Sequence, residues 1–319
     1  MFSLCWQRGY LAGQQTTYGP AKRSLAVQAE ANLRPFAIWG PGPFIPISRL
    51  SQVYSRELQP MSLTRRSLLV GAALAASSPL HAQQDQAQKM PVTEKRNTFT
   101  SGGKTIAVET FQAAGGAARP SVLMLHGADG LSYNTEYRQG ARGVAAAGYQ
   151  VHLVHYLDRT GEKRASFATL FQNFMPWMNT VQDALTFASN HPGADASRIG
   201  IIGISLGAAL GLAVSSTDPR VKTLVNYFGP LPQGAVATTS RLPPTLVLHG
   251  SADPIVPVAN AYAVEALLRQ QNVPHEVRVY PGQGHGFRGA AEKDATQRAL
   301  AFLHRHLAGA DTAPLPMGG

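Results

Sequence analysis

Short apolar runs alternate with longer amphipathic stretches from about residue 92 to residue 308. The apolar runs indicate buried strands because they are nearly continuous in Val, Ile and Leu. Strands are predicted over residues 121–125, 149–156, 199–202, 221–227, 245–248 and 275–280. Helices are predicted over residues 137–147, 178–190, 259–271 and 292–307 and over the stretch that ends at residue 215. This alternation is typical of an α/β fold, a mostly parallel, doubly wound sheet with helices on both faces.

Two further segments complete the predicted domain. Residues 95–111 contain a Ser-Gly-Gly turn at 101–103 and predict a β-hairpin, whereas residues 158–173 resemble a loop. Nothing repeats and no linker divides residues 92–308, so one domain is expected there. Residues 309–319 are predicted to be a disordered tail.

The first 91 residues have a different pattern. Residues 1–60 lack sustained periodicity, and we expect them to be disordered or, with a start at Met61, not translated. Residues 61–82 combine Arg65 and Arg66, an Ala/Leu run and small residues suited to cleavage after Ala82. This resembles a twin-arginine export signal, which predicts a periplasmic protein, with residues 83–91 as a linker. The apolar run is too short to span a membrane, so no stable membrane insertion is expected.

The net charge of +10 suggests a nucleic-acid-binding protein until it is located in the chain. Residues 1–82 carry +6 of it, and no Lys/Arg cluster interleaved with aromatic residues follows, so no nucleic acid is expected as a partner. The single cysteine, Cys5, lies outside the predicted domain, which excludes a disulfide or a cysteine nucleophile there. No metal-ligand spacing or phosphate-binding glycine loop is present, so no cofactor is expected.

Candidate chemistry begins where the 199–202 strand ends. Gly203-Ile-Ser205-Leu-Gly207 lies between this strand and a helix of small residues, the pattern of a nucleophile elbow. Such a turn is so tight that side chains two residues either side of the serine would collide, which glycine avoids. It would raise the Ser205 hydroxyl above the edge of the sheet.

Two more polar residues follow strand ends later in the chain. Asp253 comes after the strand that begins at residue 245, and His285 lies in a glycine-rich loop after the 275–280 strand. Because parallel strands end at one edge of the sheet, Ser205, Asp253 and His285 are expected to meet there. His285 would accept the serine proton, and ionised Asp253 would hold the imidazole in the right tautomer.

An oxyanion hole needs two aligned backbone N–H groups. One is expected from Leu206, and the other from Ala128 in Leu-His126-Gly127-Ala-Asp-Gly-Leu after the 121–125 strand. His126 and His249, each in a Leu-His-Gly sequence at a strand end, are interpreted as shaping their loops.

These motifs together resemble the dienelactone hydrolase family of α/β-hydrolases. They are L-H-G-A-D-G-L, G-I-S-L-G, H-G-S-A-D-P-I-V-P and P-G-Q-G-H-G-F. The resemblance covers about residues 92–308 and implies Ser205 as nucleophile, Asp253 and His285 as its partners, and Ala128 with Leu206 as oxyanion donors. The namesake enzymes use a cysteine nucleophile and a glutamate in the first loop, where this chain has Ser205 and Gly127. This difference favours a general esterase over a dienelactone-opening enzyme.

Aromatic residues at the end of the 149–156 strand and in the stretch after it are candidates for the substrate pocket. They are Tyr156, Phe174 and Trp177, and the neighbouring Phe171 and Met175 suggest an apolar lid; plain packing is the alternative. Arg159 or Arg164 would suit a substrate carboxylate, with solvation at the surface as the alternative.

The predicted activity is cleavage of a small carboxylic ester or lactone through an acyl-enzyme. A peptidase or an acyl transferase with the same triad remains an alternative, as does a catalytically silent binding module. Substrate identity and oligomeric state are left open by the sequence, because function depends on loops grafted onto the fold.

Overall fold

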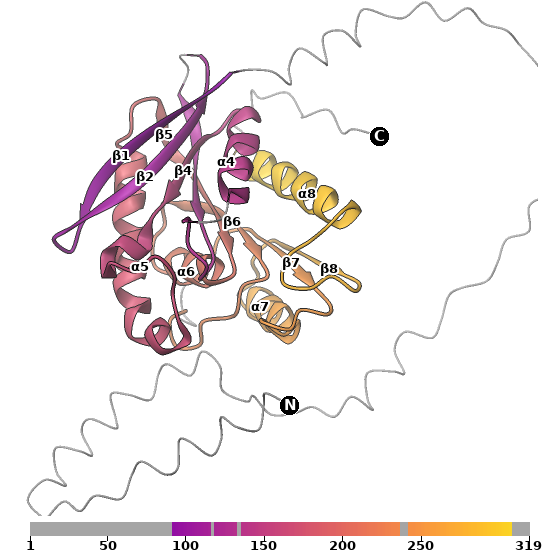
Figure 1. Ribbon diagram of the computed structural model, residues 1–319. Helices are drawn as coiled ribbons and strands as arrows, with labels where there is room; N and C mark the ends of the chain where they lie inside the picture. Colours follow the sequence, from indigo (N-terminus) through magenta and orange to yellow (C-terminus); the bar gives the residue numbers. More distant parts are fainter. Residues whose placement is uncertain (1–90, 116–117, 133–134, 237–241, 308–319) are drawn as a thin grey trace, which may run out of the picture.

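A computed structural model describes residues 91–115, 118–132, 135–236 and 242–307. An eight-stranded sheet with the order β1-β2-β4-β3-β5-β6-β7-β8 runs through the molecule (Figure 1). The strands from β4 to β8 pair in parallel, and β1 and β2 add an antiparallel edge. The predicted mostly parallel, doubly wound sheet is confirmed.

The predicted hairpin forms that edge. β1 (Val92–Ser101) and β2 (Lys104–Ala113) pair along their full length. Gly102 and Gly103 make the turn with φ of 48° and 74°, the left-handed region that favours glycine. β1 is largely exposed and carries Glu, Lys and Arg, as is usual for an edge strand.

The remaining strands and helices follow the predicted order. The other strands are β3 (Arg119–Leu125), β4 (Gln150–Val154), β5 (Ala194–Ile204), β6 (Val221–Tyr227), β7 (Thr245–Gly250) and β8 (His275–Tyr280). The α-helices are α4 (Glu136–Ala146), α5 (Phe167–Ser189), α6 (Leu206–Ser215), α7 (Ala259–Gln270) and α8 (Ala290–Leu307). β4 and β7 are buried at every position, their polar residues included, as expected for central strands covered on both faces.

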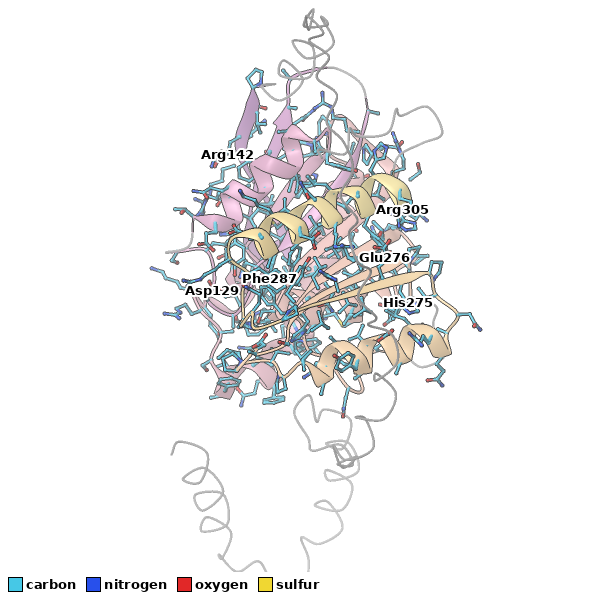
Figure 2. All side chains as sticks on the ribbon, turned by 90° about the vertical axis from the view of Figure 1, so that its right-hand side faces the viewer. Asp129, Arg142, His275, Glu276, Phe287 and Arg305 are labelled. Atoms are coloured by element: carbon cyan, nitrogen blue, oxygen red, sulfur yellow. The ribbon has the colours of Figure 1, made fainter. Side chains whose placement is uncertain are left out.

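Two apolar cores lie on opposite faces of the sheet. α5, α6 and α7 pack on one face, and α4 and α8 cover the other (Figure 1). Figure 2 shows α8 crossing in front of the sheet, with Arg305 near its end and Glu276 of β8 below. Arg305 donates a hydrogen bond to Glu276 and ties the helix to the edge strand. The carboxyl ends of the parallel strands remain available for a site.

The prediction of a loop over residues 158–173 is wrong in its second half. A 3-10 helix, η4 (Tyr156–Thr160), follows β4, and α5 begins at Phe167. Ser166 caps α5, because its hydroxyl accepts a hydrogen bond from the Thr169 N–H at 3.2 Å and its own N–H donates to the Thr169 hydroxyl. The helix also runs through Pro176, because the apolar side chains on either side pack onto the sheet.

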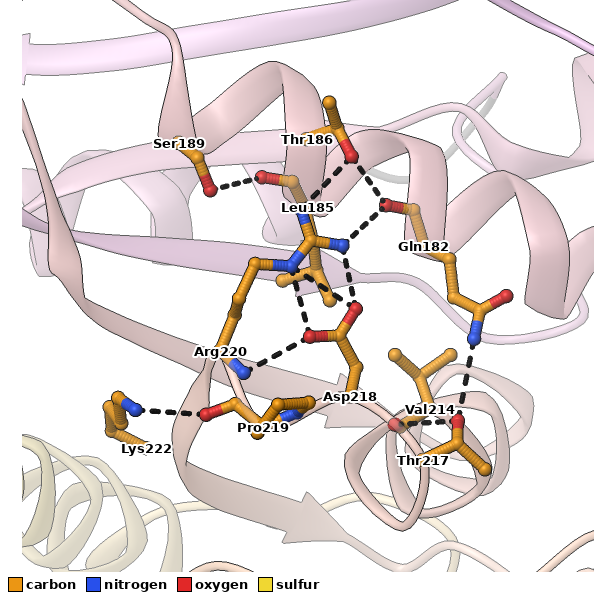
Figure 3. Close-up of polar contacts among 10 residues, drawn as sticks. All are labelled: Gln182, Leu185, Thr186, Ser189, Val214, Thr217, Asp218, Pro219, Arg220 and Lys222. Carbon is orange, nitrogen blue, oxygen red and sulfur yellow. Dashed lines mark hydrogen bonds and ion pairs between the residues drawn. The ribbon is translucent and has the colours of Figure 1, made fainter.

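Arg220 fixes the end of the sheet opposite the strand carboxyl ends. It pairs with Asp218, and it donates to the Thr186 hydroxyl at 2.9 Å and to the Gln182 carbonyl at 3.4 Å (Figure 3). These contacts join α5 to the connection between α6 and β6. They hold the connection that follows the C-terminal end of α6.

Glu109 of β2 forms a buried ionic contact. Its carboxylate accepts hydrogen bonds from Arg138 of α4 at 2.6 and 2.7 Å and from His155 at 2.8 Å. Burial by itself would raise the pKa of Glu109, but the bonds from His155 and Arg138 outweigh it and hold the pKa at about 2. The contact joins α4 to β2 and to the residue that follows β4.

The ionised form of Glu109 is expected to stabilise the fold in a defined pH range. Its pKa is lowered from 4.5 to about 2, so the stabilisation is present above pH 4.5 and is lost as the pH falls towards 2. At neutral pH it amounts to at most about 3 kcal/mol. Urea unfolding of the native protein and Glu109→Gln is expected to give a larger difference in stability at about pH 6 than at about pH 3. A difference independent of pH would contradict this assignment.

No helix among the described residues is long and apolar enough to cross a membrane. The predicted export signal at 61–82, the segments at 1–60 and 83–90 and the tail at 309–319 lie outside the described residues. These assignments stay predictions.

Candidate active site

Ser205 occupies a strained turn between β5 and α6. Its backbone has φ 54° and ψ −115°, an unusual conformation for a residue with a side chain. A Cβ at Gly203 would lie 2.5 Å from the Cα of Ala208, and one at Gly207 would lie 2.3 Å from the Leu125 carbonyl oxygen. Both contacts are with backbone atoms that cannot move aside. The spacing of the two glycines is therefore a steric requirement of this turn.

Ser205, His285 and Asp253 form one hydrogen-bonded line. His285 Nε2 lies 2.9 Å from Ser205 Oγ, and His285 Nδ1 lies 2.7 Å from Asp253 Oδ2. With its proton on Nδ1, the ring donates to the carboxylate and leaves Nε2 to accept the serine proton. The structure thus brings together the three residues that the sequence predicted, after β5, β7 and β8.

The Asp253 carboxylate is oriented by its own loop. Its side chain is fully buried, and Oδ1 accepts hydrogen bonds from the N–H groups of Ile255 at 2.8 Å and Val256 at 2.9 Å. These bonds use Oδ1, so Oδ2 faces His285. Two backbone donors on Oδ1 and the imidazole on Oδ2 together fix the orientation of the carboxylate.

His249 supports this loop from behind. Its Nε2 donates to the Val256 carbonyl at 2.8 Å and lies 3.5 Å from Asp253 Oδ2. Burial lowers the pKa of His249, which keeps the ring neutral near physiological pH. Its position agrees with the predicted loop-shaping role.

Phe228 contacts the site although sequence reasoning did not single it out. It follows β6 with φ 40°, and its N–H donates to the Leu248 carbonyl at 2.7 Å. Its ring centroid lies 4.7 Å from that of His285. A strained backbone that holds an aromatic ring against the imidazole restricts where His285 can move. The only signal in the sequence was its position directly after a strand.

The two predicted oxyanion residues flank the nucleophile. Ala128 and Leu206 line the same cavity as Ser205. Leu206 is the first residue of α6, so its N–H has no acceptor within the helix. The Ala128 carbonyl accepts a hydrogen bond from Ala165 at 2.8 Å, which fixes the plane of that part of the loop.

Tyr137 of α4 braces the same loop. Its hydroxyl accepts a hydrogen bond from the Gly127 N–H at 3.0 Å and donates one to Asp129 Oδ1 at 2.7 Å. Burial and the Asp129 carboxylate raise the pKa of Tyr137 well above its ordinary value, so the hydroxyl keeps its proton. One side chain therefore binds the residues on both sides of Ala128.

We expect Tyr137→Phe to lower kcat for an ester about tenfold and to leave KM within about twofold. The reason is that loss of the hydroxyl frees the Ala128 N–H to move away from the predicted oxyanion position, and oxyanion stabilisation appears mainly in kcat. Steady-state kinetics of the variant beside the exposed Tyr262→Phe measure this. Equal losses in both variants, or a change confined to KM, would show that Tyr137 does not position the loop.

His126 has a structural position in this loop. It is buried and stacks on Tyr156 with ring centroids 4.2 Å apart, and its Nδ1 lies 2.7 Å from the Gly127 carbonyl. Burial lowers the pKa of His126 to about 4. A buried, neutral ring that is bonded to its own loop agrees with the predicted role in shaping the loop.

Of the three predicted pocket residues, one lines the cavity beside Ser205. Phe174 does, together with residues of α5, α6 and three neighbouring loops. Tyr156 and Trp177 are fully buried in the core behind it: the Tyr156 hydroxyl donates to the His126 carbonyl at 2.7 Å, and Trp177 Nε1 donates to the Thr160 hydroxyl at 2.9 Å. Their polar atoms make hydrogen bonds inside the core. The prediction that Tyr156 and Trp177 line the substrate pocket is therefore corrected.

The arginines considered for a substrate carboxylate lie elsewhere. Arg159 donates to the carbonyls of Ser101 and Gly102 at the turn of the hairpin. Arg164 is exposed and is not among the described residues that line the cavity. Within the described part of the chain, no group of three or more His, Cys, Asp or Glu side chains is arranged to hold a metal ion.

Comparison with known proteins gives related sequences and folds. The model of the dienelactone hydrolase family matches residues 107–307. A rice acylamino-acid-releasing enzyme is 23% identical over 245 residues, which are 62% of this chain and 31% of that protein. A carboxymethylenebutenolidase homologue of Yersinia pestis is 26% identical over 147 residues, 41% of this chain and 54% of that protein. The chain thus spans about a third and about half of these two relatives.

A solved structure shows the same fold. It is a dienelactone hydrolase-like promiscuous phosphotriesterase from metagenomic libraries, with a TM-score of 0.60 and 20% identity. The match covers 68% of this chain and 99% of that one. The family model covers well over half of the sequence, and the sheet and elbow agree with it. The chain belongs to the dienelactone hydrolase family and has the α/β-hydrolase fold.

Proposed function

We propose that this protein is a serine hydrolase that cleaves carboxylic esters or lactones through an acyl-enzyme on Ser205. The observation that carries the proposal is the line of hydrogen bonds from Ser205 Oγ through His285 to Asp253, at 2.9 and 2.7 Å. These distances lie in the range at which an imidazole takes a proton from an attacking hydroxyl.

In the first half of the reaction, Ser205 Oγ attacks the carbonyl carbon while His285 Nε2 takes its proton. The carbonyl oxygen becomes an oxyanion that accepts hydrogen bonds from the backbone N–H groups of Ala128 and Leu206. The imidazolium is stabilised by Asp253 and then gives its proton to the leaving alcohol oxygen. The bond from the carbonyl carbon to that oxygen breaks, and an ester to Ser205 remains.

In the second half, water replaces the alcohol. His285 takes a proton from this water, the hydroxide adds to the acyl carbon, and Ser205 leaves with the proton returned by His285. The products are a carboxylic acid and the free enzyme. Ser205, His285 and Asp253 act in both half-reactions, and every proton transfer is between these groups, the leaving alcohol and water. These steps use no metal or redox cofactor.

A fluorophosphonate probe tests the proposal directly, because it phosphonylates an activated serine and the phosphonyl-enzyme is not hydrolysed further. We expect stoichiometric labelling of the full chain, with the modified peptide containing Ser205, and turnover of 4-nitrophenyl acetate that the label abolishes. A protein that binds neither probe nor ester would instead be a silent binding module.

An amide substrate separates the esterase from a peptidase with the same triad. The rice relative is named as an acylamino-acid-releasing enzyme, which is why the peptidase is tested, although the chain matches only 31% of that protein. We expect hydrolysis of 4-nitrophenyl acetate to exceed that of N-acetylalanine 4-nitroanilide by about 1,000-fold or more in kcat/KM, a difference of about 4 kcal/mol in barrier. Comparable rates would replace the esterase proposal by a peptidase.

A further inference from the structure

An apolar cavity of about 60 Å³ opens beside Ser205. Its walls are formed by apolar residues of α5, α6 and three loops, and Ser205 supplies the one polar side chain among the described residues that line it. The lining residues besides Ser205 are Ala128, Phe167, Leu170, Phe174, Leu206, Ala209, Pro230, Ile255 and Val256. None of them carries a charge.

The cavity lies on the acyl side of the scissile bond. A leaving alcohol must lie within reach of His285, because the imidazole returns a proton to its oxygen. His285 is not one of the described lining residues, whereas Ala128 and Leu206, the oxyanion donors of the proposed mechanism, are. The part of the substrate that enters the cavity is therefore the part that stays on Ser205.

The burial of its residues shows which end of the cavity is closed. Phe174 and Ala209 are each 1% exposed, whereas Phe167 and Ile255 are 64% and 51% exposed. The first pair forms the interior and the second pair the rim. A volume of about 60 Å³ holds only a few water molecules, so the interior has room for a short chain only.

We propose that this cavity selects substrates with a short, uncharged, aliphatic acyl group, an inference that rests on the esterase function proposed above. A carboxylate in the acyl chain would lose its hydration on entering the cavity. None of the described side chains that line the cavity offers it a cation or an N–H donor in return, so its transfer is strongly unfavourable. A long chain would have to displace the buried Phe174 or remain at the exposed rim. The cavity is thus a filter for both charge and length.

Four esters with one leaving group test both properties. We would measure kcat/KM for 4-nitrophenyl acetate, butyrate, octanoate and hemisuccinate, after subtracting the rate with Ser205→Ala. The native protein is expected to prefer butyrate to hemisuccinate by about 100-fold or more and to octanoate by about tenfold. Because the leaving group is constant, these ratios report the acyl side alone.

Phe174→Ala is expected to raise the octanoate-to-acetate ratio by about tenfold, since it removes the inner wall. Phe171→Ala is the matched control: it makes the same change one turn earlier in α5, at a side chain that is 41% exposed and outside the cavity lining, and its ratio is expected to stay within about twofold. Ala209→Val, which narrows the interior without opening a void, is expected to lower the butyrate-to-acetate ratio about tenfold. It keeps the test decisive if Phe174→Ala unfolds.

Equal rates for butyrate and hemisuccinate would overturn the charge filter. Equal effects of Phe174→Ala or Ala209→Val on every ester would overturn the length filter. Both outcomes leave the esterase itself intact, because acetate turnover and fluorophosphonate labelling of Ser205 persist. Loss of labelling and of all turnover in the native protein would instead reject the proposed function, and this inference with it.

Discussion

Replacement of Ser205 by alanine is expected to lower kcat for 4-nitrophenyl acetate by about 10⁴- to 10⁶-fold. Without Oγ there is no acyl-enzyme, and His285 Nε2 loses the hydroxyl that lies 2.9 Å away. Any rate that remains would come from the oxyanion donors and from substrate binding. The fluorophosphonate label is expected to be lost in the same variant.

The fold is expected to survive this change. The Ser205 side chain makes no capping hydrogen bond to α6, and the turn is held by the backbone bond from the Ser205 N–H to the Tyr227 carbonyl at 2.9 Å. Ser215→Ala is a matched control, because Ser215 is a buried serine at the other end of α6 whose hydroxyl has no partner in the described part of the chain. Activity that persists in Ser205→Ala, or that falls equally in Ser215→Ala, would remove Ser205 from the mechanism.

Asp253→Asn is expected to lower kcat by about 10⁴-fold with the fold intact. The N–H groups of Ile255 and Val256 both point at Oδ1, so the asparagine amide must place its oxygen there. Its NH₂ then faces His285 Nδ1 and forces that nitrogen to accept a hydrogen bond. The proton moves to Nε2, and the ring no longer accepts the proton of Ser205.

The control for this change is Asp195→Asn. Asp195 bonds Ser197 and Arg198 at the start of β5, at the opposite end of the sheet from the site. It is expected to leave kcat within about twofold. A loss of less than tenfold in Asp253→Asn would show that His285 keeps its tautomer without the carboxylate. Circular dichroism of the variant would reveal a loss of activity that comes from unfolding.

Much of this molecule was predictable from local sequence. Buried parallel strands have continuous apolar runs, so the order of strands and helices could be assigned before the structure. The elbow glycines follow from steric contact within a few residues of Ser205 and with the neighbouring β3. The start of α5 was missed because a Ser-x-x-Thr cap and packing onto the sheet override the loop-like composition of residues 158–173.

The pocket shows where sequence reasoning stops. Tyr156, Phe174 and Trp177 have similar apolar character, yet only Phe174 lines the cavity. The other two find polar partners in the core, at the His126 carbonyl and the Thr160 hydroxyl. Which face of a helix looks into a cavity depends on how that helix is rotated on the sheet, and no spacing in α5 specifies this.

The sequence by itself determined the α/β class, the succession of strands and helices along the chain, and the residues Ser205, Asp253 and His285 as candidates. It did so because strand ends, tight turns and apolar periodicity are local properties of the chain. Only the tertiary structure decided that these three side chains lie in one hydrogen-bonded line, that Phe228 and Tyr137 hold the site, and that the cavity beside Ser205 is small and uncharged. Those properties depend on contacts between residues tens of positions apart, whose distances are set when the helices pack against the sheet.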